Sequence, residues 1–129
     1  MAMGAVFAKS TKQKLNTRSS TETKIVAVDD LMPDILWCSL FLENQEYKTK
    51  GTILHQDNTS TITWEEKGRQ SLGKHAKHIN VRYFFITDCI KKGELKVKYC
   101  PTAEMLGDFS TKPLQEGQFL KLRAAIMGK

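Results

Sequence analysis

The stretch RSSTETKIVAVDD, residues 18–30, carries the start signals of a long helix. Ser19 and Glu22 have the spacing of a capping box, and an apolar stripe follows them. The pattern predicts a helix from about Ser20 to about Glu46, with Pro33 producing either one bent helix or two abutting helices. Lys24 falls on the core-facing stripe, so its ammonium group needs a partner.

Outside this helix, short apolar segments alternate with helical patterns. Strands are predicted at residues 4–10, 52–56 and 94–100, and helices at residues 59–70, 79–93, 102–112 and 115–129, with Gly93 ending the second of these helices. This order of elements predicts an α/β fold with mostly parallel strands. Trp37 and Trp64 lie among apolar neighbours and are predicted to be core residues, and Cys38 is interpreted as a packing residue.

The composition favours one folded domain that binds a polyanion. The chain has 129 residues and a net charge of +6, and nucleic acid is the leading partner for such a basic chain. No apolar run approaches the length of a membrane span, and the first residues lack a secretory signal, so we expect neither a membrane contact nor secretion. The three cysteines have no CxxC spacing and indicate neither a disulfide framework nor a thiolate metal site.

Two carboxylates occupy positions at which ligand-binding sites often form. Asp57 ends a predicted strand, and Asp108 lies early in a helix after the next strand. Because ligand sites gather at strand ends in open α/β sheets, these groups could converge on Mg²⁺. The alternative is structural: Asp57 and Asn58 cap the following helix, and Asp108 is a solvated helix residue.

Four segments carry a resemblance to a known family. QKLNTRSSTE, HQDNTS, KHAKHINVRYFFI and CPTAEMLGDFSTKPL resemble, in order, the signatures of the ribonuclease H domain that ends the Pol polyprotein of copia-type LTR retrotransposons. The resemblance implies a ribonuclease H-like α/β fold, here with a truncated mixed sheet that lacks the opening strands and is flanked by helices. It also implies hydrolysis of RNA in RNA–DNA hybrids by two Mg²⁺ or Mn²⁺ ions bound to four acidic residues.

The family's acidic residues carry over only in part. Asp57 and Asp108 match two metal-binding, catalytic acids, but Lys24 stands where the family places the helix glutamate. Glu22 lies two residues away, about 200° around the helix, and cannot replace it. No Asp or Glu precedes Glu22 to supply the fourth acid. The resemblance therefore predicts residues 1–18 as a residual strand and basic connector and residues 19–129 as a partial ribonuclease H-like domain.

Two interpretations of Lys24 stay open. Its ammonium either pairs with Asp57 and Asp108 in place of the metals, or extends to solvent. The chain is accordingly either a ribonuclease H that is inactive alone and completed by upstream polyprotein, or a non-catalytic nucleic-acid-binding remnant that binds no metal; an inert relic is a third alternative.

Basic residues flank the predicted elements and would contact nucleic-acid phosphates. They are Lys12, Lys14, Arg18, Lys67, Arg69, Lys74, His75, Lys77 and His78. By the resemblance, the partners are an RNA–DNA hybrid and the upstream reverse transcriptase part of the polyprotein, and the locations are cytoplasmic virus-like particles and the nucleus. Because the opening strands are absent, an open sheet edge also predicts self-association.

Overall fold

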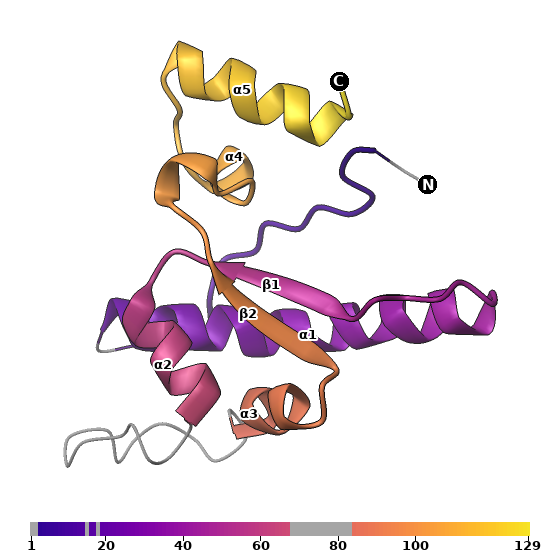
Figure 1. Ribbon diagram of the computed structural model, residues 1–129. Helices are drawn as coiled ribbons and strands as arrows, with labels where there is room; N and C mark the ends of the chain where they lie inside the picture. The colour runs from indigo at the N-terminus through magenta and orange to yellow at the C-terminus, as the bar shows by residue number, and fades with distance from the viewer. Residues whose placement is uncertain (1–2, 15, 18, 68–83) are drawn as a thin grey trace. The chain divides into compact units, whose positions relative to one another are not determined.

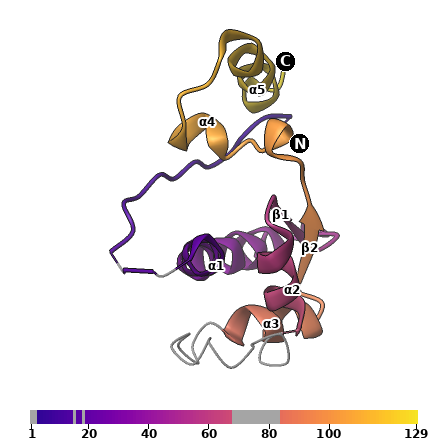
Figure 2. The ribbon, with the colours of Figure 1, turned by 90° about the vertical axis from the view of Figure 1, so that its left-hand side faces the viewer.

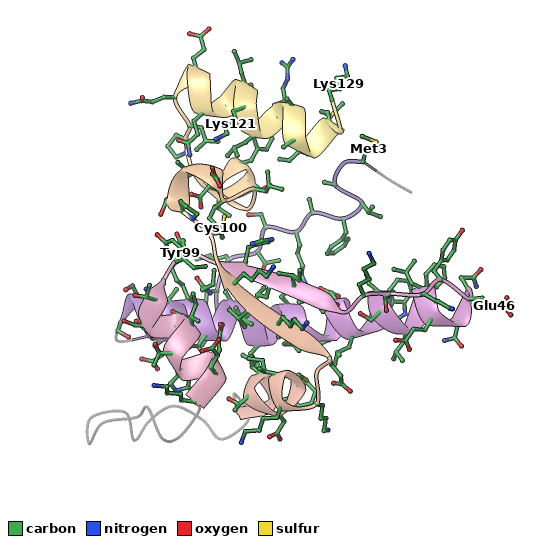
Figure 3. All side chains as sticks on the ribbon, viewed as in Figure 1. Met3, Glu46, Tyr99, Cys100, Lys121 and Lys129 are labelled. Carbon is green, nitrogen blue, oxygen red and sulfur yellow. The ribbon has the colours of Figure 1, made fainter. Side chains whose placement is uncertain are left out.

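The computed structural model describes residues 3–14, 16–17, 19–67 and 84–129. The chain forms two compact units. The sheet unit is Leu15–Tyr99, and the tail unit combines Met1–Lys14 with Cys100–Lys129. Tyr99 and Cys100, labelled in Figure 3, mark the point where the chain leaves the sheet unit and enters the tail unit.

The sheet unit is a mixed α/β structure. Its elements, drawn in Figure 1, are α1 (Ser20–Asn44), β1 (Thr52–Gln56), α2 (Thr59–Lys67), α3 (Phe84–Lys91) and β2 (Leu95–Tyr99). The strands pair in parallel, with Thr52 opposite Leu95 and Gln56 opposite Tyr99. The α/β class, the parallel pairing and these two strands are as predicted from the sequence. The described part of the chain contains no other strand.

Helix α1 begins as its capping signal predicts. The Ser19 side chain, in an extended residue, accepts a hydrogen bond from the Glu22 amide at 3.1 Å. The helix then continues through Pro33 to Asn44 without interruption, so the alternative of two abutting helices is wrong. With a rise of about 1.5 Å per residue, α1 is much longer than either strand and extends past the start of β1 (Figure 1).

The core of the sheet unit lies between α1, α2, α3 and the sheet. Parallel pairing over so few residues needs helices packed against it. Figure 2 shows α1 nearly end-on beside the two strands. The core side chains are Ile25, Val26, Val28 and Met32 from α1, Trp64 from α2, Ile86 and Cys89 from α3, and Leu95 from β2.

The two tryptophans have different environments. Trp64 is 4% exposed, as predicted, but Trp37 is 64% exposed and Cys38 is also exposed, so the core assignments of Trp37 and Cys38 were wrong. The reason is helical geometry. Trp37 follows Val28 by nine residues, which is about half a turn beyond two full turns, so the two side chains lie on opposite faces of α1.

The sheet has one covered face and one exposed face. Leu54 and Gln56 of β1 and Leu95 of β2 point toward the core, whereas the alternating residues are exposed. The exposed face, named here the outer sheet face, consists of Ile53, His55, Lys96 and Lys98. The register places Ile53 opposite Lys96 and His55 opposite Lys98, so three basic side chains share this surface.

The C-terminal part of the tail unit contains three helical segments. They are η3 (Thr102–Glu104), α4 (Asp108–Thr111) and α5 (Glu116–Met127). The single helix expected at residues 102–112 is therefore wrong: Met105 has an extended backbone, and Gly107, a poor helix former, follows before α4 begins. The terminal helix is confirmed and ends at Gly128, whose φ of 72° suits a glycine.

Residues 4–10 do not form the predicted strand. The Ala5 amide donates one hydrogen bond to the Ile126 carbonyl at 2.8 Å, while Val6 and Phe7 are exposed. An apolar run becomes a strand only beside a neighbouring strand, and α5 supplies a helix end instead. The prediction of a residual strand within residues 1–18 is therefore wrong for residues 4–10.

Two further predictions concern helices. The one expected at residues 79–93 is confirmed over Phe84–Lys91, and Gly93, with φ of 77°, follows its end. Residues 79–83 lie outside the described part of the chain. Within the described part, no helix combines the length and the apolar character that crossing a membrane requires.

Candidate functional site

The end of β1 brings Asp57 to the first turns of α1. Asp57 directly follows β1, and the Lys24 Nζ atom donates a hydrogen bond to Asp57 Oδ1, forming an ion pair. The Lys24 side chain is 36% exposed and the Asp57 side chain only 10%. The ammonium therefore does not simply extend to solvent, and the pairing of Lys24 with Asp57 is confirmed. The predicted pairing of Lys24 with Asp108 stays a prediction.

Asn58 has the structural role that the alternative interpretation gave to this turn. Its Oδ1 atom accepts a hydrogen bond from the Thr61 amide at 3.0 Å, and its carbonyl accepts one from Ile62 at 3.1 Å. These bonds begin α2. The two neighbouring side chains therefore have different roles: Asn58 caps α2, and Asp57 pairs with Lys24.

Asp108 belongs to the tail unit, where it begins α4. Both of its carboxylate oxygens lie 3.1 Å from Lys112 Nζ, one turn along the chain. The Asp108 side chain is 12% exposed, so its interpretation as a solvated helix residue is wrong. Each of the two aspartates matched to the family thus has a lysine beside it.

These residues do not fit a divalent cation site. Mg²⁺ needs several oxygen ligands held around one point. Among the described residues, no three His, Cys, Asp or Glu side chains gather in a way that could hold a metal ion. Asp57 already faces an ammonium group, whose positive charge would repel a cation placed there.

The described members of the predicted nucleic-acid surface are all exposed. Lys12 and Lys14 lie in the tail unit, and Lys67 ends α2 in the sheet unit. The remaining predicted contacts, Arg18, Arg69, Lys74, His75, Lys77 and His78, lie outside the described residues. The outer sheet face carries three further exposed basic residues, His55, Lys96 and Lys98. The alternation in ELKVKYC signals the two lysines, since every second residue there is charged.

A second carboxylate of the sheet unit, Glu65 of α2, is fully buried. Burial raises its pKa from 4.5 to about 7, although the nearby Gln56 amide lowers it somewhat and Glu66 raises it further. Neither Glu65 oxygen makes a hydrogen bond within 3.5 Å to the described residues. The sequence contained a signal for this: Thr61, Trp64 and Glu65 share one helix face, and the first two are buried.

Comparison with known proteins shows which sequences this chain is similar to. No model of a known protein family and no solved structure matches the chain. The retrovirus-related Pol polyprotein from transposon RE1 of Arabidopsis thaliana is 30% identical over 118 residues, which is 91% of this chain and 8% of that protein. The corresponding polyprotein from transposon TNT 1-94 of Nicotiana tabacum is 28% identical over 116 residues, covering 90% of this chain and 9% of that protein.

This chain resembles a short segment of a retrotransposon Pol polyprotein. A third relative, the Pol polyprotein from transposon RE2 of Arabidopsis thaliana, supports the same conclusion, at 31% identity over 85% of this chain and 8% of that protein. The chain thus spans less than a tenth of the length of these Pol polyproteins. The similarity extends over both of its compact units, because each match covers 85% or more of the chain.

The Lys24–Asp57 pair predicts a measurable coupling. In a double-mutant cycle with Lys24→Met and Asp57→Asn, we expect a coupling free energy of about 0.5–3 kcal/mol from urea unfolding at pH 7. Lys24→Met alone destabilises the fold because it leaves the nearly buried Asp57 without its cation. The matched control is Lys121 with Glu104, 3.9 Å apart and both well exposed, whose coupling should be smaller. Equal coupling in both cycles would contradict this prediction.

Glu65 predicts a pH dependence of folding stability. Its carboxyl binds a proton more tightly when folded, so the contribution of Glu65 to the free energy of unfolding is greatest below pH 4.5 and falls by up to roughly 3 kcal/mol as the pH rises to about 7. Glu65→Gln should remove this decline, and Glu66→Gln, at an exposed neighbour, should retain it. The measurement is urea unfolding at several pH values; parallel pH profiles for the wild-type protein and Glu65→Gln would refute the assignment.

Proposed function

We propose that this chain is a ribonuclease H-like segment of a retrotransposon Pol polyprotein that binds nucleic acid but does not hydrolyse it on its own. The observation that carries the proposal is the ion pair between Lys24 and Asp57. By the family resemblance, Lys24 stands at the position of a metal-binding glutamate. A lysine there replaces an oxygen ligand with a positive charge, and its pairing with Asp57 satisfies the remaining carboxylate without a metal.

The chemistry of hydrolysis explains why this exchange abolishes the reaction. A two-metal mechanism needs one cation to activate water and another to stabilise the leaving oxygen. One ammonium group carries a single charge and cannot lower the pKa of a bound water as a divalent cation does. By the family resemblance the reaction needs four acidic ligands, and Asp57 and Asp108 match two of them.

The excess of positive charge supports nucleic-acid binding. Phosphate contacts by lysine need no base recognition, which suits a protein that accepts a hybrid of any sequence. We place these contacts at the predicted basic residues and also at His55, Lys96 and Lys98 on the outer sheet face. On one strand, Lys96 and Lys98 point to the same side about two residue rises apart, so both can face one nucleic-acid backbone.

The partner and location follow from the same resemblance and are part of the proposal. In the described part of the chain, β1 pairs with β2 alone, which leaves its other edge without a strand. An upstream segment of the polyprotein is the partner we propose for that edge. The corresponding locations are cytoplasmic virus-like particles and the nucleus.

A cleavage assay tests the proposal directly. An end-labelled RNA–DNA hybrid is incubated in Mg²⁺ and in Mn²⁺ with the wild-type chain, Lys24→Glu and Asp57→Asn, and retention of the hybrid is scored on the same gel. We expect no cleavage by any of the three proteins, and retention that weakens as salt rises. Lys24→Glu stays inactive because it restores only one ligand.

Other results of this assay would have clear meanings. Metal-dependent cleavage by the wild-type chain that disappears in Asp57→Asn would overturn the non-catalytic assignment and favour an active ribonuclease H. Absence of both cleavage and retention would overturn nucleic-acid binding and leave an inert relic.

The outer sheet face gives a second, independent prediction. Replacing Lys96 and Lys98 with glutamine should weaken hybrid binding and reduce the salt slope of the binding constant by roughly one per lysine. Lys91→Gln with Lys92→Gln removes the same charge from exposed positions at the end of α3 and serves as the control. Fluorescence anisotropy over a salt series measures both quantities. Equal losses in the two double variants would show that only net charge matters and would contradict a specific role for this face.

A further inference from the structure

The exposed side of α1 carries an ordered apolar and acidic surface. Asp30, Asp34, Trp37 and Phe41 recur at helical spacing and form one line along the helix, named here the outer stripe. The rings of Trp37 and Phe41 stack, with centroids 5.3 Å apart and planes inclined by 12°. Trp37 is 64% exposed and Phe41 50%, so a large aromatic surface faces away from the core.

The charge around the outer stripe is opposite to that of the rest of the chain. Residues 25–47 contain five Asp and Glu residues and no Lys or Arg, whereas the remaining sequence has 20 Lys and Arg against nine acids. No basic residue occupies the last turn of α1, so nothing there offsets the partial negative charge of the helix C-terminus. Asp30 and Asp34 therefore attract a cationic partner to the helix that exposes the aromatic pair.

We propose that the outer stripe docks a protein segment whose apolar side chains are flanked by Lys or Arg. Trp37 and Phe41 supply the apolar anchors, since exposed aromatic residues often dominate binding energies at interfaces. Asp30 and Asp34 supply charge complementarity at the rim, which guides association and selects the partner. This interaction goes beyond the nucleic-acid function and does not depend on it.

The negative charges of the outer stripe disfavour binding of nucleic acid, anionic lipid or a second outer stripe. Nucleic-acid phosphates and anionic lipid headgroups would both be repelled by Asp30 and Asp34, the charged residues of the outer stripe. A second copy of this chain would have to dock a basic region rather than its own outer stripe, because two acidic stripes repel each other. We therefore expect the acidic outer stripe to dock a basic surface.

The test uses a tryptophan-free, fluorescently labelled amphipathic peptide of leucine and lysine, with a leucine and glutamate peptide of the same pattern as its counterpart. The full chain is titrated into each, and binding is followed by anisotropy. We expect binding of the lysine peptide only. Trp37→Ala should weaken it by about tenfold or more, and Asp30→Asn with Asp34→Asn should weaken it and reduce its salt dependence.

Tyr47→Ser is the matched control, because Tyr47 is 67% exposed but lies beyond α1 and off the outer stripe. Far-UV circular dichroism checks that each variant is folded. Equal binding of both peptides, or unchanged binding by Trp37→Ala, would overturn the proposal. Sedimentation of the chain alone tests whether a second copy of this chain occupies the outer stripe. Self-association that Trp37→Ala abolishes would assign the outer stripe to a second copy and overturn the proposal.

Discussion

The burial of one face of α1 is the constraint on which the sheet unit depends. Two short parallel strands cannot form a stable sheet by themselves, and parallel strands need a covered face. Ile25, Val28 and Met32 of α1 complete the core that α2, α3 and β2 enclose. The same packing sets the direction of Lys24, one turn before Val28, and so determines which group meets the end of β1.

The ion pair at the end of β1 connects this packing to function. An aspartate at such a strand end is well placed for metal chemistry, but its properties depend on what faces it. Here α1 presents an ammonium group, so the charge of Asp57 is balanced within the protein. The ion pair thus joins α1 to the end of β1 through two charged side chains, and it occupies the carboxylate on which the proposed loss of metal chemistry rests.

Local rules predicted much of this arrangement from the sequence. The capping box located the start of α1, alternation located β2, and strand-end position singled out Asp57. The pairing of Lys24 with Asp57 was one of two interpretations, because helical spacing gives a direction but not the partner's distance. Trp37 was misassigned because its apolar neighbours outweighed its helical angle, which places it opposite Val28. Residues 4–10 failed as a strand because strand formation depends on a neighbour that local sequence does not specify.

Asp57 and Glu65, two carboxylates of the sheet unit with little exposure, have different surroundings. The ammonium group of Lys24 lies beside Asp57, whose side chain is nearly buried. Glu65 lies deeper and has no cation beside it among the described residues, so burial favours its neutral form and its pKa rises to about 7. The difference follows from position: Lys24 lies at the edge of the core, where its stem packs and its ammonium stays partly hydrated, whereas Glu65 shares the inward face of α2 with Trp64. A carboxylate near the edge of this core therefore has a cationic partner, whereas burial at its centre shifts the Glu65 carboxyl toward its neutral form.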